Sequence, residues 1–299
     1  MSENYDLTVM GDINLDWIVR GQLPFAFVDL NVNGRIEWLP IDKKMGGSGL
    51  NFARFAQQCD YRPLLLGKVG NDLEGDFVLS QLQTLNLATG VRKDEENPTG
   101  LALIARDKKD IRFLVNNELN ANQHLSVQDV RRYQAEIKAC NLLYVSGYCF
   151  MNTGSPRTDA TLEAIKIAKQ GGKTQVIFDV VPHRFYCIEA YNSFTKFLAL
   201  THDVDILISE VATVRRFLNL GHKDEQVTES IAKETLKYLK PHYERFILRW
   251  GPSGCDHQVI WDKHTNMEKW EDTGHVDAED KRGFGDRLAL QVLREVYKV

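Results

Sequence analysis

Residues 141–179 read NLLYVSGYCFMNTGSPRTDATLEAIKIAKQGGKTQVIFD, and this stretch decides the fold. Residues 141–146 are almost continuously apolar, which is typical of a strand buried on both faces of a parallel sheet. Residues 159–170 carry apolar side chains at helical spacing, and Gly171-Gly172 then ends the helix. A second apolar strand follows at 175–179. A strand, a helix and another strand in this order predict a parallel βαβ unit.

The same alternation of strands and helices extends over the rest of the chain. We therefore predict a doubly wound α/β fold, with a mostly parallel central sheet flanked by helices. Because the sequence contains no repeat, low-complexity tract or Pro/Gly-rich linker, one domain over residues 1–299 is favoured over two tandem domains. The predicted strands are 7–10, 62–69, 204–209 and 245–249, and the predicted helices are 48–59, 72–85, 211–218 and 225–239.

Two other stretches alternate between apolar and polar residues with period two. Residues 28–38 do so around Asn33-Gly34, which is the strongest short-range signal for a β-hairpin. Residues 100–105 and 110–115 form a second alternating pair, joined by a charged turn. We expect these pieces to form a small antiparallel sheet apart from the main body.

The composition excludes several classes of protein. The chain has 37 Lys and Arg against 41 Asp and Glu, a net charge of −4, so it lacks the positive excess that a general nucleic-acid binder needs. Its apolar runs are too short for a membrane span, and its first residues do not have the pattern of a signal peptide, so we expect a cytoplasmic protein. Five scattered cysteines without Cys-x-x-Cys, and the absence of His-Glu-x-x-His, favour reduced thiols and no dedicated transition-metal site.

The most informative motif is Gly283-Phe284-Gly285-Asp286, which directly precedes the helical run RLALQVL. Glycines before a helix let backbone N–H groups converge on an anion at the positive end of the helix dipole. A carboxylate beside such an anion site is suited to phosphoryl transfer, because it can take the proton of the attacking hydroxyl. The alternative interpretation is an ordinary helix start, in which Asp286 only complements the dipole.

Further motifs occur in a fixed order along the chain. Together with residues 283–286 they resemble the ribokinase-like carbohydrate kinases of the PfkB family, and the resemblance covers nearly the whole chain. It implies a ribokinase-like fold and ATP-dependent phosphorylation of a hydroxyl of a sugar or nucleoside. The motifs that carry it are GDINLD at 11–16, MGGSGLN at 45–51, GKVGNDLEG at 67–75, TG at 99–100 and NAN at 120–122.

The resemblance also implies roles for individual residues. Asp286 would be the general base, and the backbone N–H groups of Gly283, Phe284 and Gly285 would form the anion hole, with Phe284 where the family usually has Ala. Turn caps and plain loop glycines remain the alternative interpretation of the substrate-binding candidates. By resemblance these candidates are Asn14, Asp16, Gly46, Gly47 and Asn51.

In the same way, the alternating stretches at about 17–42 and 100–115 correspond to the lid of the family, which closes over the substrate and excludes water. Lids of many members pair between subunits. The resemblance therefore implies a small sugar or nucleoside as the binding partner and a possible homodimer through the lid.

The nucleotide side departs most from the family pattern. The resemblance implies ATP and Mg²⁺ as cofactors, with Arg249, Gly251 and Gly254 near the nucleotide, although Arg249 replaces a usual Thr. The Asn-x-x-Glu segment that helps to organise Mg²⁺ is altered, so Glu210 is a weak candidate for holding a metal-bound water. The chain ends at Val299, whereas relatives continue through helices that enclose the adenine, so we expect an incomplete adenine pocket.

These departures leave a second hypothesis open. A degenerate relative would bind a sugar or a nucleotide in a regulatory role without transferring phosphate. The retained Asp286 and both glycines favour the enzyme, whereas the altered segment and the early end favour the binder. A nicotinamide oxidoreductase is disfavoured, because no Gly-x-Gly-x-x-Gly follows the first strand.

Overall fold

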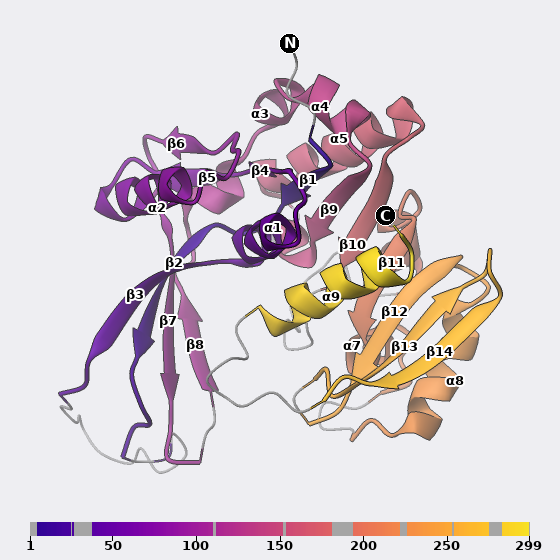
Figure 1. The fold of residues 1–299 in the computed structure, drawn as a ribbon. Helices are drawn as coiled ribbons and strands as arrows, with labels where there is room; N and C mark the ends of the chain where they lie inside the picture. Colours follow the sequence, from indigo (N-terminus) through magenta and orange to yellow (C-terminus); the bar gives the residue numbers. More distant parts are fainter. Residues whose placement is uncertain are drawn as a thin grey trace.

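A central sheet of mostly parallel strands organises the protein (Figure 1). The six strands β12, β11, β10, β9, β1 and β4 are parallel neighbours, and β13 and β14 add an antiparallel edge. This arrangement confirms the predicted fold class. The computed structural model describes residues 5–24, 26, 38–109, 112–151, 154–180, 194–221, 226–252, 254–274 and 283–298.

The order of strands in this sheet reverses around β1, as it does in doubly wound folds. Consecutive strands from β9 to β12 are added on one side of β1, whereas β4 lies on the other side. From one edge to the other, the strands are β14 (Met267–Asp272), β13 (His257–Asp262), β12 (Arg245–Trp250), β11 (Ile206–Glu210), β10 (Gln175–Asp179), β9 (Leu142–Ser146), β1 (Leu7–Met10) and β4 (Pro63–Leu66).

Helices cover both faces of the sheet and bury one apolar cluster on each. One face is covered by α1 (Ser48–Gln58), α2 (Leu73–Thr84) and α9 (Phe284–Glu295), and α1 packs beside α9. The opposite face is covered by α3 (Val127–Arg131), α4 (Gln134–Ala139), α5 (Pro156–Gly171), α6 (Phe194–Leu200), α7 (Val211–Phe217) and α8 (Glu229–Leu239).

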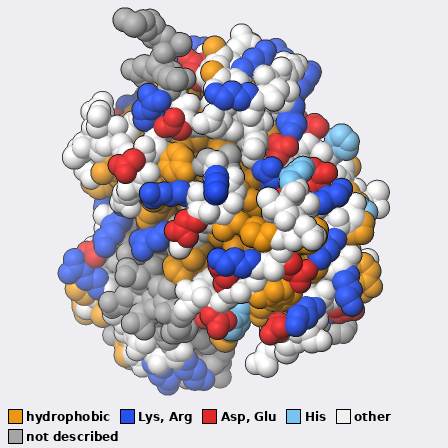
Figure 2. Space-filling view, turned by 45° about the vertical axis from the view of Figure 1, so that its right-hand side comes forward, with side chains coloured by type: hydrophobic (Ala, Val, Ile, Leu, Met, Phe, Trp, Pro, Cys, Tyr) orange, Lys and Arg blue, Asp and Glu red, His pale blue; other side chains and the backbone are white. Residues whose placement is uncertain are grey.

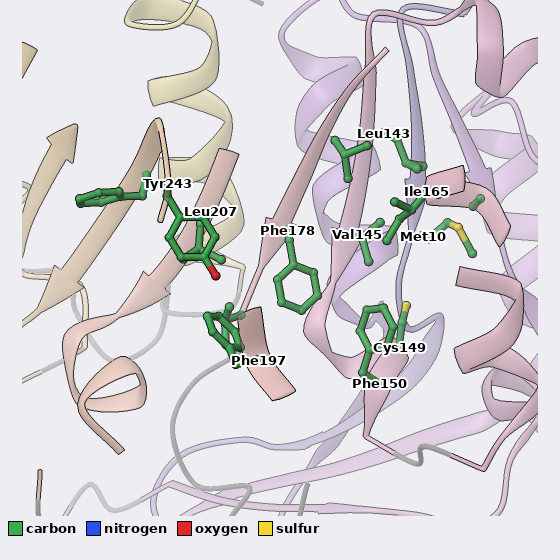
Figure 3. Packing of buried hydrophobic residues seen from close by; sticks show 14 of the residues in the cluster. Met10, Leu143, Val145, Cys149, Phe150, Ile165, Phe178, Phe197, Leu207 and Tyr243 are labelled. Atoms are coloured by element: carbon green, nitrogen blue, oxygen red, sulfur yellow. The ribbon is translucent and has the colours of Figure 1, made fainter. Parts of the chain in front are cut away.

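Alternation along each strand divides its side chains between the two clusters. In β9, Leu143 and Val145 pack with Met10 and Phe178 in the cluster drawn in Figure 3, whereas Tyr144 belongs to the cluster under α1 and α9. Each fully buried large apolar side chain contributes about 1.5–3 kcal/mol to folding. Because both faces are buried, these strands are almost continuously apolar, which is why they were predictable.

A second sheet has the strand order β3-β2-β7-β8 and projects from the main body (Figure 1). Its outer pairs are antiparallel, as expected, but β2 and β7 are parallel, so the prediction of a purely antiparallel sheet was wrong. The expected hairpin around Asn33-Gly34 lies outside the described residues. The strands are β2 (Asn14–Val19), β3 (Ile41–Gly46), β7 (Gly100–Arg106) and β8 (Arg112–Asn116).

Several smaller elements had no counterpart in the sequence prediction. The expected strand at 62–69 is divided at Gly67 into β4 and β5 (Lys68–Gly70), and β5 pairs with β6 (Arg92–Asp94). Two short 3₁₀ helices lie at Ala121–His124 and Gly147–Phe150. On the face shown in Figure 2, positive and negative side chains are interspersed around apolar ones. Within the described ranges, no helix is long and apolar enough to cross a membrane.

Candidate active site

A cavity of about 440 Å³ lies where the carboxyl ends of the main-sheet strands face the second sheet. One wall is the second sheet, whose inner face presents cross-strand neighbours such as Asp16 and Ala102. The opposite wall contains the start of α9 and the ends of β10, β11 and β12. Ligand sites in open α/β sheets lie at this edge, because the loops leaving the strands converge there.

The start of α9 forms one end of the cavity. Gly283 precedes the helix with a left-handed φ of 68°, and an added Cβ would lie 2.7 Å from Phe55 Cε2 of α1. Both facts explain a glycine at this position. The first N–H groups of α9 have no partner within the helix, so they are available to an anion at its positive end. The structure therefore brings the expected anion-hole residues Gly283, Phe284 and Gly285 to the cavity, beside Asp286.

Alternation in the sheet explains which side chains face Asp286. Ile177, Ile208 and Ile247 belong to the cluster under α9. The residues two positions further along these strands project from the same face at its carboxyl edge. These residues are Asp179, Glu210 and Arg249, and all of them line the cavity.

The carboxyl group of Asp286 lies in a half-buried polar cluster. The Tyr144 hydroxyl is 3.3 Å from Asp286 Oδ1 and 3.1 Å from Asp179 Oδ2. Burial and the charge of Asp179 raise the pKa of Asp286 well above its usual value. Burial also raises the pKa of Asp179, to about 6, although Arg249 and the Tyr144 hydroxyl act in the opposite direction. A carboxyl group with a raised pKa is a stronger proton acceptor than an ordinary aspartate, and this is the chemistry that a general base beside an anion site needs.

Arg249 brings a positive charge to this cluster. Its side chain is 4% exposed, and its Nη1 donates to the Gly285 carbonyl oxygen at 3.0 Å. Its Nε and Nη2 have no hydrogen-bond partner although they are buried. A guanidinium with two unpaired nitrogens next to the start of α9 can neutralise negative charge on a bound phosphoryl group after a small side-chain movement.

The other two nucleotide candidates do not line the cavity. Gly251 has φ 121° and lines a separate cavity of about 360 Å³, where Trp250 and Trp270 meet edge to face. Gly254 has φ 88° and leaves room for Glu210, since an added Cβ would lie 2.7 Å from Glu210 Oε1. Both glycines are thus required by backbone conformation, and their role toward a nucleotide remains a prediction.

Four of the five sugar-side candidates line the same cavity, and Asn51 lies beside the start of α9, since an added Cβ at Gly283 would be 3.4 Å from Asn51 Cβ. Asn14 and Asp16 are 9% and 8% exposed and line it together with Gly47 and Asn51. Gly46 does not line it: an added Cβ there would collide with the Asp16 carboxylate, so this glycine makes room for Asp16. The two short polar side chains present the donors and acceptors that a vicinal diol needs.

Three residues with clear positions here were not assigned a role from the sequence: Asn122, Tyr144 and Arg157. Asn122 donates from Nδ2 to Asn14 Oδ1 at 2.9 Å and thereby orients the amide of Asn14. Arg157 of α5 forms a buried ion pair with Asp12, which lines the cavity, and donates to the Tyr148 carbonyl oxygen at 2.6 Å. The NAN motif was a signal for Asn122, whereas Tyr144 and Arg157 lie in an apolar strand and an ordinary helix, where nothing marks them as functional.

The residues present are compatible with a bound nucleotide and with Mg²⁺. The orphaned nitrogens of Arg249 and the free N–H groups of α9 suit phosphate oxygens. No group of three or more His, Cys, Asp or Glu within the described ranges could hold a metal ion by itself. Mg²⁺ in phosphoryl-transfer sites keeps several waters and needs only one or two carboxylates besides the phosphates, so this finding is compatible with Mg²⁺, and contact of Glu210 with the metal stays a prediction.

Residues 24–256 match the pfkB family carbohydrate kinases, and this is well over half of the sequence. The chain therefore belongs to this family. A 5-dehydro-2-deoxygluconokinase from Clostridium beijerinckii is 26% identical over 170 residues, 56% of this chain and 49% of the relative. One from Geobacillus thermodenitrificans is 23% identical over 251 residues, 80% of this chain and 70% of the relative. The chain thus spans about half the length of the first of these relatives.

Solved structures share the fold. An E. coli protein described provisionally as Ribokinase II, in complex with ATP and Mg²⁺, superposes with a TM-score of 0.74. The identity is 16%, and the match covers 98% of this chain and 88% of that chain. Together with the parallel sheet and its flanking helices, this likeness establishes the ribokinase-like fold that the sequence motifs predicted.

Proposed function

We propose that this chain is a kinase that transfers a phosphoryl group from ATP to a hydroxyl of a sugar or nucleoside. The observation that carries the proposal is the position of Asp286, in the first turn of α9 and in the lining of a cavity that Asn14 and Asp16 also line. Membership of the pfkB family supports the reaction class.

The residues that line the cavity have different roles in this mechanism. Asn14 and Asp16 hydrogen-bond hydroxyls of the sugar and orient one of them toward Asp286. Asp286 accepts the proton of that hydroxyl as its oxygen attacks. The N–H groups at the start of α9 and the Arg249 guanidinium stabilise the negative charge on the phosphoryl oxygens. ATP with Mg²⁺ supplies the phosphoryl group.

We also propose that the second sheet is the lid of this site. Its inner face lines the cavity, whereas its outer face exposes apolar side chains. Leu103, Phe113 and Val115 are 40%, 47% and 45% exposed on that outer face. Contiguous exposed apolar surface marks interaction sites, so pairing of two lids in a homodimer would bury these side chains.

The test is phosphorylation by the purified protein with Mg²⁺-ATP. The first acceptor is 5-dehydro-2-deoxygluconate, chosen from the names of the relatives, followed by a panel of sugars and nucleosides. Asp286→Asn should lower kcat by about 10²–10⁴-fold, the usual contribution of a positioned general base. Asp159→Asn is the matched control, because Asp159 is also in the first turn of a helix but is exposed and lies on the opposite face of the sheet.

Two results would contradict the proposal. Unchanged turnover in Asp286→Asn would remove its assigned base. No turnover on the whole panel, together with saturable binding of a sugar or a rise in Tm with ATP, would favour the regulatory binder instead.

A further inference from the structure

Tyr144 is a polar side chain in the middle of a buried strand. It is fully buried, and its ring stacks on Phe52 of α1 with centroids 3.6 Å apart and planes inclined by 10°. Its neighbours in β9, Leu143 and Val145, are apolar. A phenylalanine would satisfy this packing, so only the hydroxyl distinguishes tyrosine here, and a buried hydroxyl requires a hydrogen-bond partner.

That hydroxyl lies between two carboxyl groups. It is 3.1 Å from Asp179 Oδ2 and 3.3 Å from Asp286 Oδ1. The three residues come from β9, β10 and α9 and are separated by 35 and 142 positions in the sequence. The fold therefore connects a second carboxyl group, that of Asp179, to the proposed base Asp286 through a single hydroxyl group.

The number of protons limits how these three groups can interact. A tyrosine hydroxyl carries one hydrogen, so it donates to one carboxylate only. If both carboxylates were ionised, one of the two contacts would bring a lone pair of the Tyr144 oxygen against a negative carboxylate oxygen. One additional proton removes this conflict, because one carboxyl group then donates to the Tyr144 oxygen while Tyr144 donates to the other. The arrangement is satisfied when the pair of carboxyl groups holds one proton.

The surrounding charges agree with a shared proton. Arg249 on β12 is positive and lowers the pKa values of both Asp179 and Asp286, and Glu210 on β11 is negative and raises that of Asp179. Burial outweighs the arginine, so the pKa of Asp179 is raised to about 6 and that of Asp286 is also raised well above its usual value. Among the residues that the structure describes, the titratable and charged groups around this pair are Tyr144, Glu210, Arg249 and Cys255.

We propose that Tyr144 is a positioning residue for Asp286 and links it to Asp179 in a relay, so that the two carboxyl groups share one proton through the Tyr144 hydroxyl. The proposal rests on the proposed function, because it gives Asp286 the role of base. It adds two residues to the reaction that the family motifs do not include.

The relay moves one proton without any other reactant. When Asp286 holds the shared proton, it donates this proton to the Tyr144 oxygen, and Tyr144 releases its own hydroxyl proton to Asp179. Asp286 is then an anion, Tyr144 is again a neutral phenol and Asp179 is a neutral acid. The ionised Asp286 can accept the proton of the substrate hydroxyl. After transfer the pair holds two protons, one of which leaves to solvent.

Two isosteric substitutions test the relay through the pH dependence of kcat. Tyr144→Phe keeps the ring stacking but removes a hydrogen bond that lowers both carboxyl pKa values, so the acid limb of the profile should move to higher pH. We expect kcat at neutral pH to fall about 10- to 100-fold, with KM changed less than about threefold. Asp179→Asn removes a negative neighbour, so its acid limb should move to lower pH.

A matched control separates this effect from the general loss of a buried hydroxyl. Tyr243 is also a buried tyrosine, but its hydroxyl bonds to Thr201 in the apolar cluster on the other face of the sheet. Tyr243→Phe should leave the pH profile unchanged. Acid limbs that stay at the wild-type position in Tyr144→Phe and Asp179→Asn, or that both move in the same direction, would overturn the relay.

A second measurement does not depend on turnover. NMR spectra of protein labelled in the aspartate carboxyl carbons follow each carboxyl group, with Asp179→Asn and Asp286→Asn identifying the two signals. We expect each signal to show both titration steps of a coupled pair, and both steps to move to higher pH in Tyr144→Phe. Independent titration of both groups at ordinary aspartate values would refute the relay. If the shared titration is seen but Asp286→Asn retains full activity, the proposed function fails instead.

Discussion

Replacing Asn122 with alanine should destabilise the protein and weaken sugar binding at the same time. The Asn122 side chain is 4% exposed and makes three hydrogen bonds. Its Oδ1 accepts from the Ile13 N–H at 2.9 Å, and its Nδ2 donates to the Ile13 carbonyl oxygen at 3.2 Å and to Asn14 Oδ1 at 2.9 Å. The amide thus fixes the backbone that leads into β2 and orients a residue proposed to bind the sugar.

The expected magnitude follows from these contacts. Each hydrogen bond contributes about 1 kcal/mol net, and a buried backbone N–H left without a partner costs about 1–3 kcal/mol. We therefore expect Asn122→Ala to lower the free energy of unfolding by about 2–4 kcal/mol. Because Asn14 also loses the partner that orients its amide, KM for the sugar should rise about tenfold, with a smaller change in kcat.

Urea unfolding measures the first effect and steady-state kinetics the second. The midpoint should fall while the m-value stays constant, since the surface exposed on unfolding is the same. Gln123→Ala is the control, because the neighbouring Gln123 side chain makes an exposed hydrogen bond to the Glu118 carbonyl oxygen. This control should lose about 1 kcal/mol or less. A loss below about 1 kcal/mol in Asn122→Ala, or an unchanged KM, would refute the assigned role.

Three further substitutions test other parts of the structure. Gly47→Ala should lower the free energy of unfolding by at least about 2 kcal/mol, because Gly47 has φ 95° and an added Cβ would collide with the Asp12 carbonyl oxygen. An unchanged midpoint of urea unfolding would contradict this. Burial works to raise the pKa of Asp94, but hydrogen bonds, first among them that from Asn97, outweigh it and lower the pKa to about 2. Asp94 therefore stabilises the folded protein above its unfolded pKa of about 3.9, and this contribution is lost as pH falls toward 2. Asp94→Asn should therefore make the free energy of unfolding, measured with urea, fall less steeply as pH is lowered through this range. Phe113→Asp on the outer face of the lid should shift a homodimer toward monomer in sedimentation velocity, and equal sedimentation of variant and wild type would argue against lid pairing.

The parts of the fold that could be predicted from sequence are those buried on both faces. The predicted strand at 175–179 coincides with β10, because every residue between its polar ends is apolar. The edge strands β13 and β14 were not predicted. They carry polar pairs such as His257-Gln258 and Glu268-Lys269, which interrupt the apolar pattern, and only β14 is the outermost strand, where residues need not be apolar.

The candidate site was predictable only in its motif residues. Gly283 and Asp286 are neighbours in the sequence, so their relation to the start of a helix could be inferred from spacing alone. Tyr144 and Asp286 are 142 residues apart, and Tyr144 lies in a strand whose apolar pattern indicates only a core position. Its hydroxyl acquires a function through the strand register and the docking of α9, which are properties of tertiary structure.

The charged residues that line the cavity affect how strongly it repels an incoming triphosphate. Of its described lining residues, Arg249 is positive, whereas Asp12, Asp16, Asp179, Glu210 and Asp286 are acidic. The acidic group Asp12 is neutralised by Arg157, and a proton shared by Asp179 and Asp286 removes one further charge. Repulsion of an incoming triphosphate is thereby reduced where it would be greatest, at the start of α9. Because acidic charge still exceeds what Arg249 offsets, a divalent cation brought with the nucleotide suits this site, and we expect Glu210 to contact its hydration shell.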